Sequence, residues 1–296
     1  MDTLHKFLFH AAPVRGGVVR LERAWQRMTE FHDYPAPVTR LLGEMTAAAA
    51  LLATNIKFNG ALILQIHGDG PVKLLVVECQ PDLRMRATAK LGDGPIADDT
   101  QGLQRLVNTH GRGRCAITLD PIDRLPGQQP YQGVVPLEGD SIAQALQTYM
   151  QRSEQLDSRL WLAADGAAAA GLLLQKLPQE GGRAGRSAGD DDTWSRTTML
   201  AGTLTREELL HTDCGTLTRR LFWQETLEPF APLIPRFECT CSRERIGRML
   251  ISLGRAEVEG IVAEQGRVEV TCDFCNARRV FDAIDVRQLF ATGAVE

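Results

Sequence analysis

Four of the seven cysteines fall into two tight pairs near the C-terminus, and this spacing constrains the fold more than any other feature. Cys239 and Cys241 form a C-x-C motif, and Cys272 and Cys275 form a C-x-x-C motif thirty residues further on. Each pair can turn two sulfurs toward one point, and four thiolates at one point suit Zn²⁺. We therefore predict that these four cysteines hold one zinc ion per chain in the reduced state. The alternatives are buried apolar cysteines or a structural disulfide, but isolated core cysteines do not come as two spaced pairs.

The residues around the pairs resemble a known family. Residues 237–245 read FECTCSRER, and residues 272–275 read CDFC. Two further blocks resemble the same family. One is residues 131–137 (YQGVVPL), followed by residues 141–156, and the other is residues 68–71 (GDGP), which lie between two apolar runs. These blocks are spread over most of the chain, which resembles the redox-regulated bacterial heat-shock chaperones, also called the thirty-three-kilodalton chaperonins.

The resemblance implies an ATP-independent holdase, which is a chaperone that binds unfolding proteins under oxidative stress and is not an enzyme. It implies that the reduced, zinc-bound form is inactive and that the oxidised form is active, often as a homodimer. The four cysteines match the family's zinc and redox positions, including the gap between the pairs. The Gly-rich stretch at residues 181–189 is not matched, and no motif fixes the client-binding surface.

Composition narrows the classes of partner. The chain has 296 residues, a net charge of −4 and a pI of about 5.9, which argue against a general electrostatic attraction to nucleic acid or to an anionic membrane. The longest apolar runs, residues 47–53 and 167–174, are far shorter than the ~20 residues of a membrane-spanning helix. The first residues lack the apolar length of a secretory signal. We expect a cytoplasmic protein, in which a cysteine cluster binds metal or is redox-active.

Residues 1–178 are predicted to form a large α+β core domain. Alternation and turn signals predict strands at residues 4–9, 14–21, 61–66, 72–78, 83–89, 114–119, 132–137, 159–164 and 168–177. Apolar spacing predicts helices at residues 22–32, 38–57, 102–107 and 142–156, the last capped by Asp140 or Ser141. The three strands between residues 61 and 89 suggest an antiparallel meander.

Residues 179–236 are predicted to be a Gly-rich tether followed by a marginally stable helical linker. Residues 178–192 contain four glycines and end in Asp190-Asp191-Asp192, which could cap a helix that begins at Thr193. The pattern from Trp194 to Glu225 is helical but broken, with a capping box at residues 205–208. Three prolines between residues 229 and 235 end helical structure.

Residues 237–296 are predicted to form a small zinc domain. Ser242 is a candidate N-cap for a helix with Ile246, Met249, Leu250 and Leu253 inward, closed by Gly254. A second helix is expected at residues 257–264 with Val258, Ile261 and Val262 buried. A hairpin with the C-x-x-C at its turn and a final helix from Asp285, with Val286, Leu289 and Phe290 inward, complete the domain.

A domain of about sixty residues buries too little surface to be stable without a bound metal or a disulfide, so zinc loss should unfold it. Peroxide or hypochlorous acid can turn the paired thiolates into disulfides, and the nearest partners are Cys239 with Cys241 and Cys272 with Cys275. Unfolding would undock the linker and expose apolar side chains that bind unfolding proteins. The candidate client-binding residues are Leu209, Leu210, Leu217, Leu221, Phe222 and Trp223.

The remaining candidates are weaker. Cys79 and Cys115 lie in strand-like apolar runs and are expected to be ordinary buried residues. Cys214 is more exposed in pattern and could react secondarily, although a residue that begins a helix is the simpler interpretation. Four arginines beside the ligands either balance the negative charge of the site or are ordinary surface residues, and these are Arg243, Arg245, Arg278 and Arg279.

Two rival functions are kept open. A zinc-ribbon nucleic-acid binder fits the expected hairpin and the nearby arginines, but it conflicts with the acidic pI. A thiol–disulfide oxidoreductase that uses Cys272 and Cys275 would need the C-x-x-C at the start of a helix, where one thiol pKa is lowered. A strand leading into a turn is expected there instead.

Overall fold

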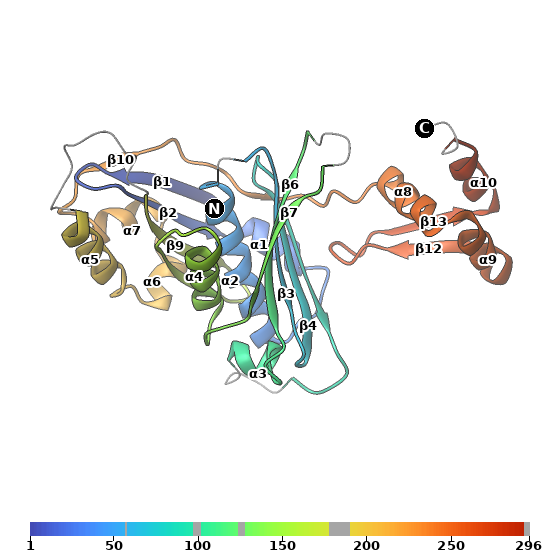
Figure 1. Cartoon of the computed structure of the whole chain (residues 1–296), viewed down its shortest axis with the longest axis horizontal. Coiled ribbons are helices and arrows are strands. Elements are labelled where there is room, and N and C mark those ends of the chain that lie inside the picture. The colour runs from blue at the N-terminus through green and yellow to red at the C-terminus, as the bar shows by residue number, and fades with distance from the viewer. Residues whose placement is uncertain (57, 97–101, 124–127, 178–189, 293–296) are drawn as a thin grey trace. The chain divides into compact units, whose positions relative to one another are not determined.

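The structure, a computed structural model, describes residues 1–56, 58–96, 102–123, 128–177 and 190–292. The backbone divides into two compact units, Met1–Glu238 and Cys239–Glu296, which are described separately. Figure 1 shows their helices and strands along the chain. The mixed α+β class predicted from the sequence is confirmed. The finer division at residues 178 and 236 stays a prediction.

The first unit contains a five-stranded sheet in which every neighbouring pair is antiparallel. In spatial order its strands are β10 (Leu227–Pro229), β1 (Thr3–Phe9), β2 (Val14–Leu21), β9 (Ala169–Lys176) and β8 (Ser158–Ala164). A Cβ on Gly16 would lie 2.3 Å from the Phe7 ring on the next strand, so glycine is needed there.

A six-stranded sheet forms the rest of this unit's β-structure. Its spatial order is β11 (Arg236–Phe237), β5 (Arg84–Leu91), β4 (Val72–Cys79), β3 (Gly60–His67), β6 (Arg114–Pro121) and β7 (Tyr131–Pro136). The antiparallel pairs of β3 with β4 and of β4 with β5 confirm the predicted meander. Only β11 runs parallel to its neighbour.

Helix α2 (Ala36–Ala53) lies between the two sheets and contacts strands of both (Figure 1). Residues 47–52 are at most 1 % exposed, because apolar side chains approach the helix from both sides. The alanines in this run let the sheets come close. The other helices of this part are α1 (Arg23–Thr29), α3 (Leu103–Val107) and α4 (Ile142–Ser153), and the Ser141 hydroxyl caps α4 as predicted.

Three short helices cover the other face of the five-stranded sheet. They are α5 (Asp190–Ala201), α6 (Arg206–His211) and α7 (Cys214–Leu221). The predicted capping box of Thr205 and Glu208 is present at the start of α6. Helix α5 begins at Asp190 rather than at Thr193, so the acidic run forms its first turn. Most of the predicted Gly-rich tether, residues 178–189, lies outside the described residues.

The second unit is built from α8 (Arg243–Leu253), α9 (Arg255–Gln265), the antiparallel hairpin β12 (Arg267–Thr271) and β13 (Arg278–Asp282), and α10 (Ala283–Thr292). Among the described residues of this unit, six side chains form the buried core, namely Ile246, Leu250, Val258, Val268, Phe281 and Val286. The prediction that Met249 and Leu253 face inward is wrong, because these residues are 44 % and 55 % exposed. An 11-residue helix over so small a core can bury only a narrow stripe.

Across the described residues, no helix has the length and apolar character needed to cross a bilayer.

Candidate metal centre

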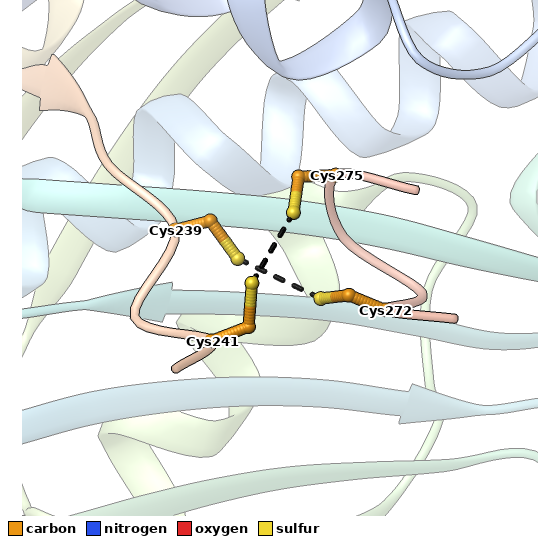
Figure 2. Close-up of side chains that lie close together, drawn as sticks. All are labelled: Cys239, Cys241, Cys272 and Cys275. Atoms are coloured by element: carbon orange, nitrogen blue, oxygen red, sulfur yellow. Dashed lines mark hydrogen bonds between the residues drawn. The ribbon is translucent and has the colours of Figure 1, made fainter. Parts of the chain in front are cut away.

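The four paired cysteines converge on one point, as Figure 2 shows. Their Sγ atoms all lie within 4.8 Å of one another, and each side chain is half-buried. The Cys239 and Cys272 sulfurs are 3.6 Å apart, and those of Cys241 and Cys275 are 3.4 Å apart. Four thiolates held about 2.3 Å from a tetrahedral zinc ion lie about 3.8 Å from one another. The donor set and its spacing therefore fit a zinc ion.

Local structure fixes the position of each pair. Cys239 and Cys241 lie in the loop between β11 and α8, where the Ser242 hydroxyl accepts a hydrogen bond from the Arg245 N–H and caps the helix. The helix therefore begins two residues after Cys241, and the positive end of its dipole lies near this pair. The Ser242 cap and the C-x-C motif both involve residues close together in sequence, so both could be recognised from the sequence alone.

The second pair lies in the turn of the β12–β13 hairpin. The Cys272 N–H donates to the Ala277 carbonyl (3.1 Å), and the Asn276 N–H donates to the Cys272 carbonyl (2.9 Å). Asn276 has φ of 52°, the left-handed conformation that asparagine tolerates better than most residues. This tight turn aims the Cys272 and Cys275 sulfurs at the same side.

Without a cation, two of the four thiols hold their protons more tightly than a free cysteine does. Burial, followed by the neighbouring thiols of Cys275 and Cys239, raises the pKa of Cys241. Burial likewise raises the pKa of Cys275. A divalent cation reverses this preference because coordination requires thiolates, so loading the site should release protons.

The four nearby arginines have different surroundings. Arg243 forms an ion pair with Asp285 (2.7 Å), and its guanidinium lies 4.3 Å from the Phe281 ring centroid. Arg278 forms an ion pair with Glu269, and Arg279 donates to the Arg278 carbonyl.

Arg245 donates from Nη1 to the Thr240 hydroxyl (2.8 Å), between the two cysteines of the first pair. Its guanidinium is therefore hydrogen-bonded to a side chain that lies between two candidate metal ligands.

No disulfide joins cysteines in the described part of the chain, which includes all seven of them. The sulfur contacts of Cys239 with Cys272 and of Cys241 with Cys275 run between the two motifs, whereas the pairing predicted from the sequence runs within each motif. Both distances exceed the about 2.05 Å of an S–S bond. Which cysteines pair on oxidation stays a prediction.

The other three cysteines are buried. Burial raises the pKa of Cys79, Cys115 and Cys214 to about 12, so these thiols are poorly reactive. The expected exposure of Cys214 is wrong. Its side chain packs in a cluster between α7 and the five-stranded sheet, although Cys214 does begin a helix as the alternative interpretation held.

The candidate client-binding residues are mostly covered in this structure. Leu209, Leu210, Leu217 and Phe222 are at most 3 % exposed, and Leu221 packs at the edge of the same cluster. Trp223 differs, with 75 % of its side chain exposed.

Sequence reasoning did not identify the surface beneath these helices. Phe222 meets the Phe9 ring edge-on at 5.2 Å and lies 5.8 Å from Phe7, and Leu172 and Leu174 belong to the same cluster. The F-x-F spacing of Phe7 and Phe9 was the available signal, because alternate residues of a strand point to one face.

Comparison with known proteins gives consistent matches along the chain. A family model described as Hsp33 protein matches residues 2–282. A 33 kDa chaperonin of Methylobacillus flagellatus is 49 % identical over 99 % of this chain and 96 % of that protein. One from Neisseria meningitidis serogroup A is 45 % identical over 99 % and 93 %.

A crystal structure of the 33 kDa chaperonin from Thermotoga maritima superposes with a TM-score of 0.77 and covers 99 % of both chains. Its sequence identity is 20 %, so it bears on the fold alone.

Proposed function

Because the chain belongs to the Hsp33 family, we propose that it is a redox-regulated, ATP-independent holdase that binds unfolding proteins under oxidative stress. The observation that carries the proposal is the convergence of four thiols at one end of a unit with only six buried side chains. A unit this small depends on a cross-link such as a bound metal for its stability, and the four thiols that would hold the metal can be oxidised.

In the reduced state, Cys239, Cys241, Cys272 and Cys275 would hold one zinc ion. Bound zinc would tie the C-x-C loop to the hairpin turn and keep all four sulfurs as thiolates. The start of α8 and the Arg245–Thr240 hydrogen bond orient the first pair, and the β12–β13 turn orients the second.

Oxidation removes the ligands two at a time. Two thiolates give two electrons to hydrogen peroxide, one S–S bond forms, the O–O bond breaks, and two protons complete two water molecules. We propose that the pairs are Cys239 with Cys241 and Cys272 with Cys275. The 3.4 and 3.6 Å contacts between the motifs make crossed pairing the competing outcome, which peptide mapping by mass spectrometry distinguishes.

Loss of the four ligands then unfolds the second unit and frees the chain that precedes it. Helices α6 and α7 are short, and such helices persist only when docked. Their release would expose Leu209, Leu210, Leu217, Leu221 and Phe222 beside Trp223, together with the aromatic surface of β1. These residues are the proposed client-binding surface.

The proposed partners are unfolded or aggregation-prone proteins, with a homodimer in the active state. The negative net charge argues against nucleic acid and anionic membranes as partners. The proposal includes a cytoplasmic location, because reducing surroundings keep the switch off until an oxidant appears. It includes no catalytic residue. An oxidoreductase role is not favoured, since Cys272 and Cys275 lie in a hairpin turn rather than at a helix start.

The test is light scattering from a thermally unfolding client protein. The protein is added either reduced and zinc-loaded or after peroxide treatment, and a thiol reductant is added to half of the oxidised sample. We expect suppression of scattering by the oxidised sample alone, and its loss on reduction. Equal suppression by both forms would leave a chaperone with a structural metal, and no suppression by either would refute the proposal.

A further inference from the structure

One extended segment, residues 226–238, covers an edge of each sheet in the first unit. Strand β10 adds to β1 at the edge of the five-stranded sheet, and β11 adds to β5 at the edge of the six-stranded sheet. We call residues 226–238 the edge segment. In Figure 1 it runs from β10 toward the other sheet. Sheet edges are the places where an additional strand can bind.

The edge segment is attached to β1 through its backbone. The Leu4 N–H donates to the Leu233 carbonyl and the Leu233 N–H donates back, both at 2.9 Å. The Phe230 N–H donates to the Lys6 carbonyl, and the His10 N–H donates to the Thr226 carbonyl, again at 2.9 Å.

By the alternation of an antiparallel ladder, Leu8 also turns its N–H and C=O toward the edge segment, where Glu228 lies opposite. Every second residue of β1 is thus paired with this segment.

The attachment to β5 is similar. The Arg236 N–H donates to the Leu83 carbonyl (2.9 Å), and the Glu238 N–H donates to the Met85 carbonyl (3.1 Å). Arg84 contacts Glu238 at 3.0 Å and Arg236 contacts Asp82 at 2.8 Å, but all four side chains are substantially exposed. Exposed ion pairs contribute little and are screened by salt.

Side chains contribute little burial along most of this segment. Phe230 is 45 % exposed and Ile234 is 66 % exposed, and residues 228–232 are all exposed. Leu233 and Phe237 are partly covered, and Pro235 is buried. Recognition at both edges therefore depends chiefly on an extended backbone and only weakly on which side chains it carries. That is how strand addition binds extended peptides of varied sequence.

We propose that the edges of β1 and β5 bind extended segments of unfolded proteins, and that the edge segment occupies them in the reduced state as an internal competitor. The inference rests on the proposed holdase function and adds a mode of binding to it. When the edge segment leaves, the edge-facing amide and carbonyl groups of Leu4, Lys6 and Leu8 become open, and a client strand in the same register satisfies them. Clients would bind by backbone as well as by apolar side chains.

Hydrogen exchange with mass spectrometry tests this on the full oxidised chain. The probe is fluorescently labelled, reduced and carboxymethylated α-lactalbumin, which stays unfolded without heat, and anisotropy measures its binding. We expect oxidation to remove the protection of residues 227–237 and of the edge-facing amides of β1. Saturating probe should restore protection to β1 and β5 while residues 227–237 remain unprotected.

The outcomes separate the two claims. Binding of the probe without renewed protection in β1 or β5 would overturn strand addition and leave the holdase intact. Absence of binding by oxidised protein would refute the holdase and the strand addition together.

A pair of variants isolates the backbone contribution. Leu8→Pro removes the N–H that faces the edge and leaves the pairing of β1 with β2, because proline is tolerated where its missing N–H points away from the sheet. Leu8→Ala loses the same side chain but keeps the N–H. We expect oxidised Leu8→Pro to bind the probe about three- to tenfold more weakly than Leu8→Ala, the value of about one hydrogen bond. Equal affinities would overturn the role of β1, and if Leu8→Pro does not fold, the exchange data on the unmodified chain decide.

Discussion

Removing the metal from the reduced protein should unfold residues 239–292 and leave the two sheets and α2 of the first unit folded. Zinc bound by four thiolates contributes about 10–16 kcal/mol in small peptides. A domain of this length has a net stability of roughly 3–8 kcal/mol, at about 0.05–0.15 kcal/mol per residue. The six buried side chains of this unit do not compensate for a loss that large. The two sheets and α2 of the first unit have a core of their own, so they should persist.

The assay is amide hydrogen exchange with mass spectrometry on reduced protein, before and after a strong chelator at pH 7. Tryptophan fluorescence is unsuitable, because the four tryptophans are residues 25, 161, 194 and 223 and none lies in the second unit. We expect peptides from α8, α9 and β12 to exchange as an unfolded chain does. Peptides from β2 and β9 should keep their protection, and added zinc should restore the lost protection.

The refuting result is unchanged protection of α8, α9 and β12 in protein that holds less than about a tenth of a metal ion per chain. Such a result would mean that the fold of this unit does not depend on a metal bound by the four thiolates. Peptides from α5–α7 add a second readout. If they keep full protection in metal-free protein, loss of the metal does not release the linker, and the coupling step of the proposed switch is wrong.

Three further predictions follow from single side chains. Cys241→Ser should weaken zinc binding by about a hundredfold, since one of four ligands carries about 3 kcal/mol, and Thr240→Ser is the matched control in a competition titration. Phe222→Ala should destabilise the docked helices by about 3–5 kcal/mol in chemical denaturation, whereas exposed Trp223→Ala should change little. Burial raises the pKa of Glu44 to about 7, with Arg206 and Arg40 opposing the rise, so the folded state binds this proton more tightly than the unfolded state. Stability should therefore fall as pH rises from about 4.5 to about 7, by about 3 kcal/mol at most, and Glu44→Gln should abolish that slope in urea titrations at several pH values.

Local signals in the sequence predicted local structure well. Ser141, Thr205 and Ser242 were recognisable as caps because the hydroxyl and the amide that it accepts from are three residues apart. The convergence of the four cysteines was predictable for the same reason, since each pair needs only one turn to aim two sulfurs.

Long-range pairing was not predictable. Strands β10 and β11 have two or three residues each and lie among prolines, so neither composition nor alternation indicates them. Leu233 pairs with Leu4 from the far end of the chain, and only the folded sheet brings them together. Cys214 shows the same limit, because it is buried in a cluster that includes Phe7 and Phe9 from the other end of the chain.

The edge segment also has a consequence for synthesis. Strand β5 ends at Leu91, but its covering strand begins at Arg236, about 145 residues later. At ~5–20 residues per second, a ribosome needs roughly 7 to 29 s to make that stretch. Throughout this interval the nascent chain presents an uncovered sheet edge, so the protein is itself prone to aggregation while it is being made. The exposed Lys90 on β5 is a charge of the kind that limits such association.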